Sequence, residues 1–255
     1  MSDLDPVAAV VVGLVTLGLG VLVPALIARI PEPPPEEEPS EADVSLPVDE
    51  DDPPPVADAP EPKEPYAAVA ALPGLAWKTA LASGLSGAVL GLVVGWDWPL
   101  LFLVPLVPVS VALAVVDWRT RRLPTRVIAP TYVALIVLVL VCWLVVRDDD
   151  NLIRAGWGWL IAGGLYFVLW FVYPRGMGYG DVRLSGVLGI ALGYLGWPEL
   201  LVGIYGGFLL GGVVGGTLAL LRRVDRKGYP FGPFMLLGAL VGIVLGETVA
   251  TGLVP

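Results

Sequence analysis

The sequence predicts an all-α, polytopic membrane protein with about eight transmembrane helices, and three observations carry this prediction. The chain is 56% hydrophobic and only 15% charged, which leaves too little charged surface for a soluble protein of 255 residues. Its apolar residues fall into repeated runs of about 20 residues, the length that crosses a bilayer. The loops between these runs alternate between basic and acidic along the chain. A bundle of membrane-spanning helices accounts for all three.

The first apolar run, at residues 7–30, is expected to be an uncleaved membrane anchor. Acidic residues precede it and Arg29 lies near its end, which is the reverse of the basic start of a signal peptide. Residues 31–66 follow with 13 of the 24 acidic residues and 12 of the 25 prolines. Such a composition cannot bury enough apolar surface to fold, so we predict a disordered acidic linker. Residues 67–255 are then expected to form a seven-helix membrane domain.

The seven further spans are predicted from the remaining apolar runs. They are expected at about residues 75–96, 98–116, 126–146, 155–173, 182–196, 198–221 and 231–252. Three of the connecting loops carry ten Lys or Arg residues, and these loops are 117–126, 174–183 and 222–230. By the positive-inside rule these loops face the cytoplasm. The linker is then cytoplasmic too, and both termini lie on the extracytoplasmic side.

Two rows of glycine predict that the last two spans contain close helix contacts. A glycine recurs every fourth residue in each row, at Gly203, Gly207, Gly211 and Gly215 and again at Gly238, Gly242 and Gly246. Rows of small residues let helix backbones approach in lipid, where no hydrophobic effect drives helices together. We interpret both rows as packing surfaces rather than as a ligand site.

The residue inventory excludes several classes of function. The chain has no histidine, and its single cysteine, Cys142, lies inside an apolar run. Ser-His and Cys-His catalysis, the usual zinc sites and a disulfide framework are therefore excluded, and no metal or organic cofactor is expected. The net charge of −9 gives no basis for binding nucleic acid. Paired carboxylates remain as the main source of hydrolytic chemistry.

Asp117 and Asp181 are the candidate pair, because both lie at the predicted cytoplasmic edge of the membrane. Asp117 ends the third predicted span, where the helix dipole disfavours an acid, although a solvated charge among arginines is an alternative. Asp181 precedes the sixth predicted span, where it could serve only as an N-cap. Yet Gly176, Gly178 and Gly180 before it leave the backbone open to another chain. Two carboxyl groups held close together share a proton, so that one can activate water while the other donates.

Three sequence blocks resemble the type IV prepilin peptidase family of GxGD-type membrane aspartic proteases. These are DWRTRRLP, with its aspartate seven residues before Pro124, then GYGDVRL, and then YPFGPFMLLGA. The resemblance covers about residues 95–250 and implies that Asp117 and Asp181 are both catalytic. It also implies that Gly178 and Gly180 shape the loop that admits the scissile peptide.

The last of these blocks adds two supporting residues. Gly232 and Pro233 are expected to break the start of the final span beside the active site, with no direct chemical role. Arg183 stands where the family more often has lysine, and this change keeps the positive charge.

The resemblance implies a substrate and a location. Family members cut the basic leader peptide of a prepilin or pseudopilin after a glycine, at the cytoplasmic face of the bacterial inner membrane. The expected partners are therefore the substrate helix and the lipid bilayer, and a homo-oligomer is compatible with the sequence. Many members also N-methylate the new N-terminus with a cysteine-bearing insert. This chain has the acidic linker in place of that insert, which puts methyl transfer in doubt.

Two other functions stay open from the sequence. A presenilin-like GxGD protease would cut other membrane segments, but the Pro-Phe-Gly-Pro-Phe block at 230–234 argues against it. A proton- or cation-coupled transporter would also place acids in a membrane. Transporters of this type hold them near the midplane and often show inverted repeats, neither of which the sequence suggests.

Overall fold

Helices are the only regular elements in the residues that the structure describes, which are 4–32, 64–174, 177–220 and 230–253 of a computed structural model. The helices are α1 (Pro6–Gly20), α2 (Val23–Ala28), α3 (Tyr66–Ala70), α4 (Leu75–Val94), α5 (Leu100–Thr120), α6 (Thr125–Val146), α7 (Asp149–Val172), α8 (Tyr179–Leu195), α9 (Trp197–Leu220) and α10 (Gly232–Leu253). Most of the predicted linker, at 33–63, and most of the basic loop at 222–230 lie outside the described residues.

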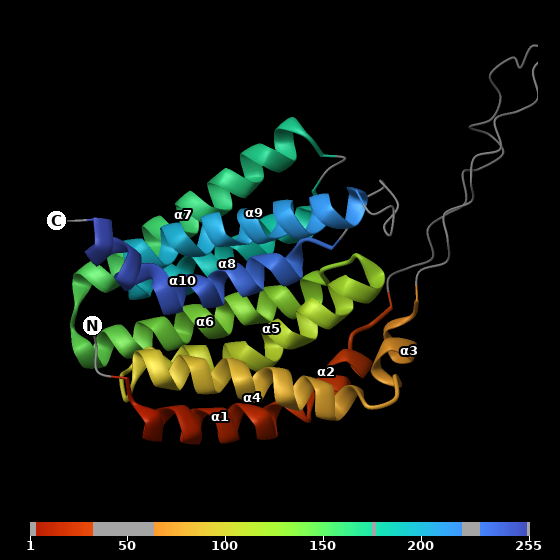
Figure 1. Cartoon of the computed structure of the whole chain (residues 1–255), viewed down its shortest axis with the longest axis horizontal. Coiled ribbons are helices and arrows are strands. Elements are labelled where there is room, and N and C mark those ends of the chain that lie inside the picture. The colour runs from red at the N-terminus through yellow and green to blue at the C-terminus, as the bar shows by residue number, and fades with distance from the viewer. Residues whose placement is uncertain (1–3, 33–63, 175–176, 221–229, 254–255) are drawn as a thin grey trace, which may run out of the picture.

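The prediction of an all-α polytopic membrane protein is confirmed. In the described ranges, seven helical segments are long and apolar enough to cross a membrane, and α1 and α2 together form the first of them. The remaining predicted span, the sixth at 182–196, corresponds to α8, which has only 17 residues. Figure 1 shows that α1 begins and α10 ends at the same end of the bundle, as an even number of crossings requires.

Several predicted boundaries need correction. The first span is interrupted between Gly20 and Val23, so it forms two helices rather than one. Tyr66, which was assigned to the linker, is buried and begins α3. The start of α7 lies six residues earlier than predicted because the Asp148 side chain caps the helix, accepting hydrogen bonds from the backbone N–H groups of Asp150 and Asn151 at 3.0 and 3.3 Å.

Glycine permits the closest helix contacts, as the sequence predicted. A Cβ added at Gly238 would lie 2.5 Å from the Cα of Gly207, and one added at Gly242 would lie 2.7 Å from the Cα of Gly203. The two glycine rows therefore face each other between α9 and α10. The same device joins α1 to α4, where a Cβ at Gly20 would lie 2.7 Å from the Ser83 side chain.

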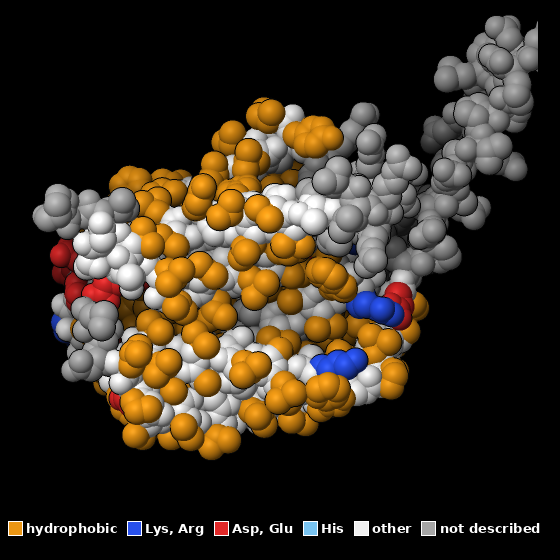
Figure 2. Space-filling view, in the orientation of Figure 1, with side chains coloured by type: hydrophobic (Ala, Val, Ile, Leu, Met, Phe, Trp, Pro, Cys, Tyr) orange, Lys and Arg blue, Asp and Glu red, His pale blue; other side chains and the backbone are white. Residues whose placement is uncertain are grey.

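The short helix α8 lies at the centre of the bundle. Nearly all of its residues from Asp181 to Tyr194 are buried, and it contacts α6, α7, α9 and α10. Its sequence is rich in Gly, Ala and Ser, which lets the neighbouring backbones come close. The helices around it present the apolar side chains seen over the flanks of the molecule in Figure 2. Acidic side chains gather at the end where α1 begins, and the larger Lys and Arg patches lie at the opposite end.

Candidate active site

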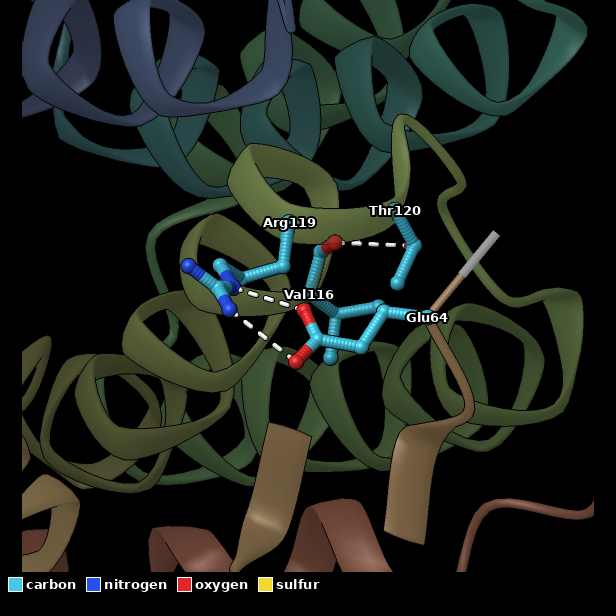
Figure 3. Close-up of polar contacts among 4 residues, drawn as sticks. All are labelled: Glu64, Val116, Arg119 and Thr120. Atoms are coloured by element: carbon cyan, nitrogen blue, oxygen red, sulfur yellow. Dashed lines mark hydrogen bonds and ion pairs between the residues drawn. The ribbon is translucent and has the colours of Figure 1, made fainter. Parts of the chain in front are cut away.

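Asp117 lies in the last turn of α5, at the basic end of the bundle, and its backbone is fixed there. The helix ends at Arg121, which adopts a left-handed conformation with a φ of 52° and donates its backbone N–H to the Asp117 carbonyl at 2.8 Å. Thr120 donates its hydroxyl to the Val116 carbonyl at 2.8 Å (Figure 3). The Asp117 side chain itself is buried, with 5% of the residue exposed.

The carboxylate of Asp117 is bound by the start of α10. Its Oδ2 accepts a hydrogen bond from the backbone N–H of Gly232 at 2.9 Å, across 115 positions of sequence. Gly232 is the first residue of α10, and the first N–H groups of a helix have no partner within the helix. The positive end of the α10 dipole therefore faces Asp117, whereas the negative end of the α5 dipole disfavours a charge at that residue. Glycine is needed at this place, because an added Cβ would lie 2.8 Å from Asp117 Oδ2.

Asp181 is the third residue of α8 and not its N-cap, which corrects the capping interpretation. The helix begins at Tyr179 with Gly178 as the cap, and Asp181 Oδ2 accepts the backbone N–H of Gly178 at 3.1 Å. Asp181 is buried, with 7% of the residue exposed. Its other oxygen, Oδ1, is buried without a hydrogen-bond partner among the described residues. A hydrogen bond to the helix start thus accounts for only one of the two oxygens of the Asp181 carboxyl group.

The two carboxyl groups belong to one site, built around Leu123. Asp117 lies close enough to Asp181 for its charge to act on that carboxyl group. A Cβ added at Gly180 would lie 2.6 Å from the Cβ of Leu123, and one added at Gly232 would lie 3.4 Å from its Cδ1. The start of α8 and the start of α10 therefore both contact the segment that follows α5. In the described part of the chain, no three His, Cys, Asp or Glu side chains group as a metal site requires.

Pro124 and Arg183 join α6 to the same site. Pro124 has an extended backbone with a ψ of 121° and is the N-cap of α6, and its carbonyl accepts the N–H of Val127 at 3.0 Å. Arg183 of α8 donates to the hydroxyl of Thr125, the first residue of α6. Its guanidinium group also lies 4.6 Å from the centre of the Tyr179 ring. The Asp-to-Pro segment and the GxGD segment are thereby held side by side.

An aromatic cluster behind the carboxyl groups was not anticipated from the sequence. Tyr166 of α7 is buried and stacks on Phe208 with ring centroids 5.0 Å apart. Both rings contact Phe231, at 6.1 and 5.6 Å, and Phe231 directly precedes Gly232. Tyr166 also lies close enough to Asp181 for the charge of this carboxylate to act on its neutral phenol. Phe231 belongs to a block that the sequence singled out, whereas nothing in the sequence distinguished Tyr166 from other apolar packing.

An ion pair ties the chain before α3 to the last turn of α5. Arg119 donates to both carboxylate oxygens of Glu64, at 2.8 and 3.0 Å (Figure 3). Tyr66 follows two residues later. Burial raises the pKa of its phenol, while the charge of Arg122 lowers this pKa and the charge of Glu32 raises it, both by less than burial does. The end of the predicted linker is therefore joined to the helix turn that carries Asp117.

A largely apolar groove leads away from the site between α4, α5, α8 and α10. Its volume is about 690 Å³. At the end nearest the carboxyl groups it is lined by Trp118 and Arg119 of α5 and by Pro233 of α10. These residues are sequence neighbours of Asp117 and of Gly232, so the groove passes the helix ends that carry the site, although neither aspartate is among its lining residues.

These features define a class of protein, a membrane-embedded helix bundle with two buried, interacting carboxyl groups. Comparison with known proteins gives the family. The model of the type IV leader peptidase family matches residues 104–216, which include both aspartates. Leader peptidase HopD of Escherichia coli is 32% identical over 155 residues, which are 59% of this chain and 94% of that protein. The chain belongs to the type IV leader peptidase family.

Two further relatives are longer than this chain. A prepilin leader peptidase/N-methyltransferase of Pseudomonas putida is 30% identical over 170 residues, which are 64% of this chain and 57% of the relative. The protein with the same name in Aeromonas salmonicida strain A449 is 29% identical over 171 residues, which are 66% and 57% of the two chains. The chain thus spans little more than half the length of these relatives. No solved structure matches it.

Proposed function

We propose that the protein is a membrane-embedded aspartic endopeptidase that removes the basic leader peptide of prepilin-like proteins after a glycine. The observation that carries the proposal is the buried pair Asp117 and Asp181, each held through one oxygen by a glycine N–H. Asp181 Oδ1 accepts no hydrogen bond from the described residues, and in the proposed mechanism the catalytic water or the substrate supplies its partner. Family membership and the relatives named as leader peptidases support the same reaction.

The proposed mechanism uses the two carboxyl groups as one unit. Two acids held close in a poorly solvated site share a single proton. The ionised carboxylate takes a proton from water as the water oxygen attacks the scissile carbonyl carbon. The protonated carboxyl group donates to the carbonyl oxygen, and a proton then passes to the leaving nitrogen as the C–N bond breaks. The products are a leader with a new carboxyl terminus and a mature protein with a free amino terminus. Either aspartate can start in either role.

The basic end of the bundle is proposed to face the cytoplasm of a bacterial inner membrane. The positive-inside rule supports this orientation, which places both aspartates at the cytoplasmic edge. Methyl transfer is not part of the proposal. The sequence offers no cysteine-bearing insert, and the relative that the chain covers almost completely is named only as a leader peptidase.

Replacing each aspartate by asparagine tests the proposal. Asp117→Asn and Asp181→Asn keep size and hydrogen bonding but remove the acid–base group, so we expect prepilin cleavage to fall by about a thousandfold. The exposed Asp150→Asn, at the other end of the bundle, is the matched control and should cleave normally. A mass measurement of a co-expressed prepilin's N-terminus reads out the cleavage site and any methylation together. Normal cleavage by a folded Asp117→Asn or Asp181→Asn protein would exclude the paired mechanism.

The same preparation separates the alternative functions. A presenilin-like protease would cut a plain transmembrane peptide as well as a prepilin, whereas we expect cleavage only of the prepilin. A transporter would instead show proton-dependent uptake into vesicles that Asp117→Ala abolishes. Both acids lie in terminal turns of α5 and α8, away from the middle of the helices where such transporters hold their ions.

A further inference from the structure

We propose that the groove between α4, α5, α8 and α10 binds the apolar helix of the substrate and so presents the scissile bond to the carboxyl groups. The proposal rests on the proposed function, because it assumes that the substrate contains a membrane helix. It adds a binding site, which neither the sequence motifs nor the comparisons assign.

The dimensions of the groove suit a helix. Its lining on α5 extends from Leu103 to Arg119, which corresponds to about 24 Å of helix at 1.5 Å per residue. This is most of the roughly 30 Å thickness of a bilayer's hydrocarbon core. A helix lying along α5 would therefore remain at membrane depth for most of its length. Its end would leave the groove at Trp118 and Pro233, whose neighbours in the chain, Asp117 and Gly232, are joined by a hydrogen bond.

The chemistry of the lining also suits an apolar helix. Small side chains make the room in the middle of the groove, and they include Ala82 on α4 and Ser110 and Ala114 on α5. Small residues let a second helix approach closely in lipid. Apart from two serines, the polar lining is confined to Lys78 and Arg119, and the lining contains no Asp or Glu. A charged or strongly polar ligand would find few partners along most of this surface.

The charges at the site end favour a peptide over an anionic lipid. A lipid phosphate would be drawn by two cations at the mouth of the groove. Arg119, however, already makes a two-bond ion pair with Glu64, which leaves Lys78 as the main attraction for an anion among the residues that line the groove. The same Glu64 lowers the positive charge that a basic leader would meet on leaving the groove. The occupant that fits both the apolar walls and this mouth is an apolar helix preceded by basic residues.

Photo-crosslinking tests the site directly. A benzophenone amino acid replaces Ser110 in the inactive Asp117→Asn protein, which is co-expressed with a prepilin. The control carries the same group at Ala134, an exposed position of α6 outside the groove. We expect an adduct from position 110 that maps to the apolar segment of the prepilin, and little from position 134. Equal adducts from both positions, or adducts to phospholipid alone, would overturn the proposal.

Filling the groove gives a second test. Ala114→Trp should lower prepilin cleavage by about tenfold or more, chiefly through a higher KM, while Ala134→Trp leaves it unchanged. Protein yield and thermal stability are compared for both, and the crosslink decides the matter if the Ala114→Trp protein does not fold. Cleavage by the wild-type protein tests the proposed function independently. If the wild type cleaves but Ala114→Trp matches it and position 110 gives no adduct, only the groove proposal fails.

Discussion

Replacing Gly232 by alanine would test whether the geometry of Asp117 depends on the start of α10. A Cβ at position 232 would lie 2.8 Å from Asp117 Oδ2 and 3.3 Å from its Cγ, well inside ordinary van der Waals contact. The positive-φ glycines of the described chain are Gly74 and Gly95, so alanine can adopt the backbone of Gly232 without strain. The substitution therefore acts through the contact, by moving the carboxylate away from the N–H that now holds it at 2.9 Å.

The loss of cleavage rate expected for Gly232→Ala can be estimated in two ways. A hydrogen bond to a charged group contributes about 1.5–3 kcal/mol, which corresponds to a factor of roughly 10 to 100. Alternatively, a catalytic group misplaced by about 1 Å lowers the rate by about a hundredfold, and a shift of several tenths of an ångström lowers it by less. Both arguments predict that Gly232→Ala lowers kcat by between about tenfold and a hundredfold.

The assay is the initial rate of prepilin cleavage in membranes, with protein amount and thermal stability measured in parallel. Gly164→Ala in α7 is the matched control, because a Cβ there would meet nothing within 4 Å. We expect Gly164→Ala to cleave at the wild-type rate and to be as stable as the wild type. If Gly232→Ala cleaves as fast as Gly164→Ala, then the contact between α10 and Asp117 does not set the activity.

Three further predictions follow from other contacts. Gly180→Ala places a Cβ 2.6 Å from the Leu123 Cβ, so we expect cleavage to fall by about tenfold with little change in thermal stability; an unchanged rate would contradict the proposed role of that contact. Glu64→Gln breaks an exposed ion pair with Arg119, so the free energy of unfolding should change by less than about 1 kcal/mol in denaturant titrations, and a larger loss would show that the pair anchors α3. Gly238→Leu forces a side chain against the backbone of α9, so we expect a clearly lower melting temperature in detergent, and a wild-type value would refute the tight α9–α10 packing.

The sequence was sufficient to predict the helices because lipid imposes strict requirements on them. Every backbone polar group in the membrane must be bonded internally, so an apolar run of sufficient length forms a helix. Helix ends were predicted less well, because they depend on single side chains. Asp148 extends α7 by one and a half turns beyond the apolar run, and no hydropathy argument includes its cap. The interruption after Gly20 and the short helix α3 are likewise local features that a hydropathy argument does not include.

The candidate site was predictable only in part. Asp117 and Asp181 stood out because acids are rare at a membrane edge. What holds Asp117, however, is a backbone N–H from Gly232, and every residue except proline carries such a group. Sequence could show that position 232 was glycine, but not that its amide met a carboxylate 115 residues away. Tyr166 was missed for a related reason, since a buried aromatic residue in a membrane helix has the same pattern whether it packs against lipid or against a functional site.

The spacing of the motifs follows from the position of Leu123. The seven positions that separate Asp117 from Pro124 allow α5 to end, the chain to turn at Arg121, and Leu123 to contact the starts of α8 and α10. A shorter segment would withdraw this side chain, and a side chain at position 180 or 232 would displace it. The segment from Asp117 to Pro124 carries one carboxylate, and through Leu123 it contacts the start of α8, which carries the other. The length of this segment and the glycines at 180 and 232 are therefore coupled, because a change in any of them would shift the two carboxylates relative to each other.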